Sequence, residues 1–302
     1  MKKILAIYYS QSGQLDEIMK NFISEIKDCD IDLIRFRPKN DFPFPWSSDV
    51  FFDAMPDCVN EIPVELEKIN YKYSKYDLIL LGYQPWYLSP SIPVSSLLVD
   101  MDFRLHASDS PVITIIGSRN MWINSQKNVS DKLAEINSKI IGNIPLIDRN
   151  QNQISAITIL HWMTTGLKTK KNRFLPKPGI SEEDIRNASE FGNILSYHLS
   201  NGSYTGMQEN FCKTGKFELS TEVWFIEKLA KRIFKIWAKI INSAGKKHNS
   251  RLFRIRVFKY YLFFALFFIA PIVLLIYKIL IVPFIYRRIQ RKKEYICCKI
   301  KQ

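Results

Sequence analysis

Short strand-like runs, mostly apolar, recur through the first half of this chain, with loops and segments of helical spacing between them. The runs occupy residues 4–9, 31–36, 76–83, 111–117 and 140–147. Segments of helical character occupy residues 16–26, 93–101 and 124–140. Apolar runs of this length are typical of strands buried on both faces of a parallel sheet. We therefore predict an α/β fold with a doubly wound, five-stranded parallel sheet.

A last amphipathic helix ends this predicted domain. Ser181 is placed to cap the helix, and three acidic residues fill its first turn, where the helix dipole favours negative charge. The helical spacing continues to about Leu199, so we expect the domain to span residues 1–200.

One connection inside the domain, residues 38–74, is too long for an ordinary loop. It contains FPFPWSSDVFFDAMPDC, which is rich in aromatic residues and proline. We expect this aromatic insertion to form a lid and to supply an apolar pocket for a substrate.

The positive charge lies almost entirely in the last third of the chain. The formal net charge is +14, but residues 1–200 carry a net charge of −2 and residues 201–302 a net charge of +16. The last third also contains an uninterrupted apolar run, residues 260–277. Basic residues beside such a run indicate a membrane as the partner, and we expect no nucleic-acid partner.

We divide this tail into a polar linker (201–220), a basic amphipathic helix (221–244) and a hydrophobic segment with basic flanks (251–302). Such an amphipathic helix lies in the membrane interface, and packing against its own domain is the alternative. The hydrophobic segment is expected either to cross the membrane once or to bend at Pro271 and re-enter, since both its flanks are positive. Both geometries anchor the chain at the cytoplasmic face of a membrane.

The five cysteines include no CxxC pair and have no nearby histidine, so we expect neither a metal site nor a disulfide framework. Cys58 is the only one with a case as a nucleophile, and burial as a small apolar residue is the alternative. Cys297 and Cys298 are candidates for acylation beside the membrane segment, and unmodified thiols at the membrane interface are the simpler expectation.

Three loops follow the first, third and fourth predicted strands, and such loops meet at one edge of a parallel sheet. The first loop lies between a strand and a helix, where hydroxyl and backbone N–H groups can hold a phosphate, but it has neither GKS/T nor GxGxxG. The candidate binding residues of the three loops are Ser10, Gln11, Ser12, Gly13 and Gln14; Gln84, Pro85, Trp86 and Tyr87; and Gly117, Ser118, Asn120 and Trp122.

The loops SQSGQ and QPWY resemble those of the flavodoxin-like superfamily. That resemblance implies FMN as the cofactor, with its phosphate in the first loop, Trp86 and Tyr87 against its ring, and the third loop at its pyrimidine edge. The sequence departs from the superfamily at Leu15, where the phosphate loop usually has a threonine.

The segments IYYSQSGQL, YQPWYLSPSIP, IGSRNMW and LPKPGISEEDI, together with the aromatic insertion, are similar to the DarA family of dialkylresorcinol and aryl-polyene biosynthesis. Members of that family are labelled condensing enzymes. The resemblance covers about the first 200 residues. It implies that a partner ketosynthase joins the acyl chains and that this chain aromatises the resulting 2,5-dialkylcyclohexane-1,3-dione, a lipophilic substrate.

Candidate acid or base residues are Tyr83, Tyr87 and His161, with Asp53 as a further one; packing or capping roles are the alternatives for each. Two other functions remain open on the sequence. One is an NAD(P)H-dependent quinone or FMN reductase, and the other is an FMN-free membrane scaffold for a condensing enzyme. A homodimer is a further open alternative.

Overall fold

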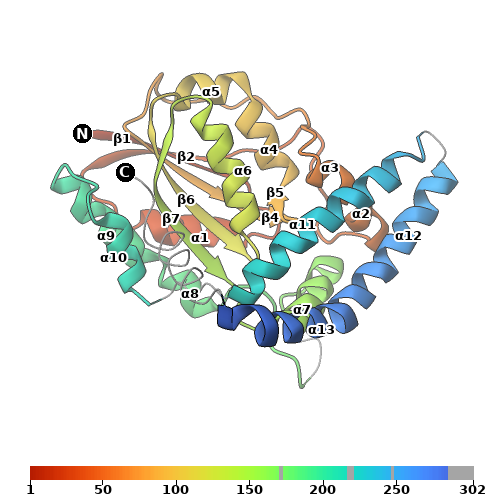
Figure 1. Ribbon diagram of the computed structural model, residues 1–302. Coiled ribbons are helices and arrows are strands. Elements are labelled where there is room, and N and C mark those ends of the chain that lie inside the picture. The colour runs from red at the N-terminus through yellow and green to blue at the C-terminus, as the bar shows by residue number, and fades with distance from the viewer. Residues whose placement is uncertain (170–172, 216–220, 246–247, 285–302) are drawn as a thin grey trace.

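The computed structural model describes residues 1–169, 173–215, 221–245 and 248–284, and its centre is a parallel β-sheet (Figure 1). The sheet has the order β2-β1-β3-β6-β7, and every neighbouring pair is parallel. Its strands are β1 (Lys2–Tyr8), β2 (Cys29–Arg35), β3 (Leu78–Tyr83), β6 (Pro111–Ser118) and β7 (Lys139–Ile147). This is the flavodoxin-like order of a doubly wound sheet, so the predicted fold class is confirmed.

Helices cover both faces of the sheet, which explains why its strands carry apolar residues without alternation. All six residues of β3, the central strand, are buried. One face packs against α1 (Gln14–Ile23), α8 (Glu182–Arg186), α9 (Ala188–Ser200) and α10 (Met207–Lys213). The other face packs against α4 (Ile92–Val99), α5 (Met101–Ala107) and α6 (Ile123–Ala134). Ser181 caps α8 as expected, because its side chain accepts a hydrogen bond from the backbone N–H of Asp184.

The segment expected as a linker, residues 201–220, contains α10, so the domain extends beyond residue 200. Met207 and Phe211 are fully buried in the core. The side-chain amide of Gln208 accepts a hydrogen bond from the N–H of Asn143 (2.7 Å) and donates one to its C=O (3.1 Å). Gln208 therefore pairs with the outer edge of β7 as another strand would.

The aromatic insertion forms two short helices, α2 (Ser48–Asp53) and α3 (Met55–Val59). Ahead of them, the backbone N–H of Trp46 donates a hydrogen bond to the C=O of Met163 (2.7 Å), in α7 (Asn152–Thr165). The insertion is thus attached to a helix at the carboxyl end of the sheet. A small antiparallel hairpin, β4 (Pro85–Trp86) and β5 (Ser89–Pro90), lies below it.

The basic amphipathic helix, α11 (Thr221–Asn242), packs against α3 and α6 of its own domain (Figure 1). Phe234, Ala238 and Ile241 are buried in a third apolar cluster, together with Phe52 and Met55 of the insertion. The apolar face of α11 is therefore partly used within the protein, while Ile236 on another side is 57% exposed.

The hydrophobic tail forms one continuous helix over the described residues 248–284 and passes through Pro271 without a hairpin turn there. It consists of α12 (His248–Phe264), the π-helical η1 (Ala265–Ile269), α13 (Ala270–Ile276) and the π-helical η2 (Tyr277–Ile281). The stretch Asn249–Phe284 is long and apolar enough to cross a membrane. Residues 285–302, including Cys297 and Cys298, lie outside the described part of the chain.

This long helix has two apolar faces. Ile255, Phe258 and Tyr277 are buried against the rest of the protein. The opposite face is exposed at Phe253, Tyr260, Phe264, Phe268, Ile272, Leu275, Ile279, Leu280 and Phe284. We call this second set the outer face of the long helix.

Glu227 attaches α11 to the domain by an unusual cap. Its Oε1 accepts a hydrogen bond from the backbone N–H of Asn124 (2.7 Å) in the first turn of α6, whose own N-cap residue, Trp122, makes no side-chain cap. Glu227 is fully buried, and its Oε2 has no hydrogen-bond partner. Burial raises the pKa of Glu227 to about 7, against the opposing effect of the backbone hydrogen bonds.

This raised pKa predicts that docking of α11 weakens with increasing pH. Because the folded state holds the proton more tightly than the unfolded state, the contribution is complete below the ordinary glutamate pKa and is lost as pH rises through about 7. Thermal unfolding should therefore show that the free energy of unfolding falls more between about pH 5 and pH 8 in the wild type than in Glu227→Gln.

The charged side chains of Lys231 and Glu61 face the same region and are present in both proteins, so the test compares the two pH slopes with each other. Equal pH slopes for wild type and Glu227→Gln would contradict the interpretation.

Candidate functional site

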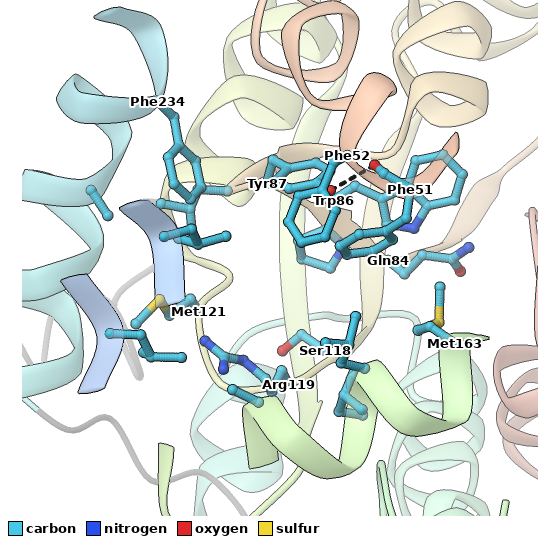
Figure 2. Close-up of a pocket in the computed structure, with 18 of the residues that line it drawn as sticks. Phe51, Phe52, Gln84, Trp86, Tyr87, Ser118, Arg119, Met121, Met163 and Phe234 are labelled. Carbon is cyan, nitrogen blue, oxygen red and sulfur yellow. Dashed lines mark hydrogen bonds between the residues drawn. The ribbon is translucent and has the colours of Figure 1, made fainter. Parts of the chain in front are cut away.

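A cavity of about 400 Å³ lies where the carboxyl ends of β1, β3 and β6 meet (Figure 2). The three candidate loops contribute to its wall as expected for loops at one edge of a parallel sheet. The candidate residues that line it are Gln11, Ser12, Gln14, Gln84, Pro85, Trp86, Tyr87, Gly117 and Ser118. The remaining loop candidates, Ser10, Gly13, Asn120 and Trp122, do not line it.

The first loop has the backbone of an anion-binding turn. Gly13 has φ +86° at the N-cap of α1, and a Cβ built there would meet nothing within 4 Å. Ser10 is buried behind the loop, where its Oγ accepts a hydrogen bond from the N–H of Asp16 (3.3 Å). Ser12 is therefore the hydroxyl of this loop that faces the cavity. Leu15, at the position where a threonine is usual, is buried in the core.

The second loop is a tight hairpin with a strained turn. Tyr87 and Leu88 have φ values of +45° and +65°, a conformation that is unfavourable for bulky side chains. The hydroxyl of Tyr87 donates a hydrogen bond to the C=O of Phe51 (2.7 Å), which ties the turn to the insertion. Contacts with the lid thus hold the two aromatic side chains of this loop in place.

The insertion closes the cavity from above with aromatic rings, as a lid would. Trp86 is in edge contact with Trp46 and with Phe42, each at a centroid distance of 5.1 Å. Phe51 contacts both Trp46 and Tyr87. Figure 2 shows Phe51, Phe52, Trp86 and Tyr87 gathered at one side of the cavity.

The third loop brings polar groups that have no partner. The Oγ of Ser118 and the Oδ1 of Asn120 are buried without a hydrogen bond, while the Nδ2 of Asn120 donates to the Oδ1 of Asn152 (3.1 Å). Trp122 turns to the other side of the sheet and is buried among the residues beneath α6. Unsatisfied buried polar atoms are rare in proteins, and here they lie in or beside a candidate binding site.

The far end of the cavity is formed by helices that sequence analysis did not connect with the site. These contribute Ala156, Ile159, Leu160 and Met163 of α7; Ile226, Leu229, Ala230, Ile233 and Phe234 of α11; and Tyr261, Leu262, Phe263, Ala265, Leu266, Ile269, Ala270 and Val273 of the long helix. The cavity therefore extends from the polar loops to the tail of the chain.

Of the candidate acid or base residues, the structure places only Tyr87 in the cavity wall. Tyr87 lines the cavity, whereas Tyr83 is buried in the sheet and donates its hydroxyl hydrogen bond to Gln126 Oε1 (2.7 Å). Burial raises the pKa of both tyrosines, so both stay protonated. His161 is on α7 beside Trp162 but does not line the cavity, and Asp53 forms an ion pair with Arg251 (2.8 Å).

Cys58 has the environment of a structural thiol. It is fully buried, and its Sγ donates to the backbone C=O of Trp86 (3.0 Å). Burial and the nearby charges of Glu61 and Asp57 raise the pKa of its thiol. The described residues contain no cluster of three or more His, Cys, Asp or Glu side chains that could hold a metal ion.

Arg119 is the residue of the site that sequence analysis missed. It lies inside the quoted segment IGSRNMW and lines the cavity, where burial lowers the pKa of its guanidinium to about 10. An arginine in a loop is normally solvated, so the sequence alone carries no sign of its burial.

The donor set fits a flavin. The loop at Gly13 offers free backbone space and the Ser12 hydroxyl, Trp86 and Tyr87 offer ring surfaces, and Ser118 offers an unpaired hydroxyl. The first loop itself offers a phosphate no positively charged side chain, since residues 9–14 include no Lys or Arg.

No family model and no curated protein matches this chain. Among solved structures, it is similar to a flavoprotein in complex with FMN from Lactobacillus acidophilus, with 24% identity, coverage of 48% of this chain and 93% of that chain, and a TM-score of 0.38. It is also similar to a flavodoxin from the domain Archaea (12% identity, 66% and 99% coverage, TM-score 0.36) and to oxidised flavodoxin 1 from Bacillus cereus (15%, 63% and 94%, 0.31). These neighbours are flavoproteins and flavodoxins; at such TM-scores, the fold assignment rests on the strand order.

Proposed function

We propose that this protein is a flavin-dependent oxidoreductase for a lipophilic ring substrate, and that its reaction is the FMN-dependent aromatisation of a 2,5-dialkylcyclohexane-1,3-dione to a dialkylresorcinol. The observation that carries the proposal is the shape of the cavity. One continuous space joins three loops suited to a flavin with an apolar wall made by the long helix. A polar redox end and an apolar end are what a ring with two alkyl chains needs.

Ser12, the loop at Gly13, Gln84, Trp86 and Ser118 would hold FMN. When bound, FMN supplies a two-electron acceptor for the two hydrogens that aromatisation removes. The residues of the chain position the substrate and exclude water from the site. The rings of Trp46, Phe51 and Trp86 exclude water above the site.

The cavity wall contains no Asp, Glu or His among its described residues. The proton that leaves the substrate therefore has no ordinary protein base within the cavity. A 1,3-dione does not need one, because its carbon acid lies between two carbonyl groups and ionises readily in water. Besides the guanidinium of Arg119, the described wall offers two phenolic hydroxyls, those of Tyr87 and Tyr261.

The long helix supports a membrane location for this reaction. Its outer face is apolar between Tyr260 and Phe284, while its inner face lines the cavity. A dialkyl ring partitions into lipid at about 0.8 kcal/mol per CH₂ group, so a cavity beside the bilayer meets its substrate at high local concentration. A ketosynthase that makes the dione is the proposed partner.

The first test is a flavin titration of detergent-purified full-length protein, compared between Gly13→Ala and Gly202→Ala. Both glycines have positive φ (+86° and +66°) and open space around a Cβ, so both substitutions carry a similar backbone penalty of about 1 kcal/mol. Only Gly13 lies in the proposed phosphate loop. We expect FMN affinity to fall about tenfold or more in Gly13→Ala and to stay unchanged in Gly202→Ala.

Anaerobic addition of a 2,5-dialkylcyclohexane-1,3-dione to the flavin-loaded protein should then bleach the flavin absorption band. Bleaching by NAD(P)H without bleaching by the dione would point to the quinone or FMN reductase function. If no FMN binds, the proposal fails and the scaffold function is favoured.

The second test separates the two faces of the long helix. Replacing Phe268, Ile272 and Leu275 by serine removes apolar surface from the outer face, where these residues are about 60% exposed, and leaves the cavity wall intact. Co-sedimentation with vesicles that contain anionic lipid should fall at least tenfold, because each large apolar side chain contributes about 1.5–3 kcal/mol when fully buried in lipid.

The matched control is Met101→Ser with Leu105→Ser, which removes comparably exposed apolar residues from α5. This control should leave vesicle binding unchanged. Equal binding by both variants would contradict the membrane role of the outer face.

A further inference from the structure

The cavity has a single fixed charge. Among the described residues that line it, Arg119 is the only one with an ionisable charged group of either sign at neutral pH. Figure 2 shows its guanidinium directed into the space that Tyr87, Trp86 and Met121 border. The rest of the wall is mainly aromatic and aliphatic, so water cannot screen this charge as it does at the surface.

No carboxylate forms an ion pair with Arg119 in the described part of the chain. The contact of its guanidinium is one hydrogen bond from Nη1 to the backbone C=O of Asn152 (3.3 Å). Asp148, the acidic residue that acts on it electrostatically, is occupied by other donors. Its two oxygens accept hydrogen bonds from the N–H and side chain of Asn150 (2.9 and 2.7 Å) and from the hydroxyl of Ser155 (2.7 Å).

A partly buried arginine without an ion-pair partner is costly unless an anion joins it, and arginine stays protonated here because its lowered pKa is still about 10. Its guanidinium lines the cavity and can donate to a negatively charged oxygen there, and hydrogen bonds between two charged groups are stronger than those between neutral ones.

We propose that the cavity binds its lipophilic ligand as an anion, with the guanidinium of Arg119 donating hydrogen bonds to its charged oxygen. This inference deepens the proposed function and rests on it for the identity of the anion, which is the enolate of the 1,3-dione. Arg119 acts as a binding and orienting residue, and the apolar wall holds the alkyl chains.

This arrangement accounts for the lack of a protein base in the cavity. The dione loses its acidic proton to bulk water, and the enolate is the form selected by Arg119, since a nearby positive charge lowers the pKa of an acid. The proposed oxidation then removes one hydride from the ring, which leaves a neutral product after rearrangement of its remaining hydrogens. Arg119 therefore favours substrate over product, which assists product release.

The test compares two probes of one shape on the full-length protein in detergent. A 2-octylcyclohexane-1,3-dione is an anion at neutral pH, and its O-methyl enol ether is neutral. We expect wild type to bind the dione about tenfold to a hundredfold more tightly than the ether, the range of a hydrogen bond to a charged group. The ultraviolet band of the enolate should persist on the protein at a lower pH than in water.

Arg119→Gln should abolish the preference for the dione and leave ether binding and FMN binding unchanged. Arg119→Lys, which keeps the charge, should retain part of the preference. Arg186→Gln is the control, because Arg186 is exposed on α8 outside the cavity and should alter neither affinity.

The inference is overturned if wild type binds both probes equally, or if Arg119→Gln weakens FMN binding and leaves the preference for the dione intact, which would assign Arg119 to the cofactor. An anion preference that depends on Arg119, without oxidation of the dione, would support the inference while the proposed function fails.

Discussion

Phe234 and Phe258 of the tail are buried against Phe52 of the aromatic insertion, and this apolar contact decides whether a cavity exists at all. The insertion also holds the strained turn at Tyr87, while the tail supplies the remaining wall. The sheet alone would present three loops at an open edge, and the insertion and the tail convert that edge into an enclosed space.

Polar groups are few in this contact region, and each has a defined position. Glu227 extends from α11 to the first turn of α6, so a carboxylate of the tail satisfies backbone donors of the domain. Such a bond is directional, whereas apolar packing allows sliding. It therefore sets the register of α11 along the domain, and with it which side chains of α11 face the cavity.

The sheet was predictable from sequence because strands buried in a parallel sheet have a recognisable pattern, a run of apolar residues without alternation. The helix α10 was not, since only Met207 and Phe211 of its seven residues are buried apolar side chains and the surrounding segment is polar. The apolar face of α11 shows a more general limit. Lipid and a protein core are both apolar, so the same periodicity suits either environment.

The candidate site was predictable to the level of loops and not of side chains. Trp86 and Ser12 reach the cavity, but Tyr83 and Trp122 are buried in the core. Tyr83 lies in a strand, where neighbouring residues point to opposite sides, and Trp122 is the N-cap residue of α6. The position of Arg119 in the cavity wall was not predictable from its own loop. Its burial depends on α7 and on the long helix, which are more than 30 residues away along the chain.

The two π-helical turns of the long helix restrict how this chain can change over time. Each contains a wider turn than an α-helix, and η1 contributes Ala265, Leu266 and Ile269 to the cavity. Losing or gaining a single residue there would rotate everything beyond it by about 100° about the helix axis. Tyr277 would leave its stacked contact with Phe225, and different side chains would be turned toward the cavity. Substitutions can therefore change the side chains of this helix one at a time, whereas an insertion or deletion changes the orientation of every residue beyond it.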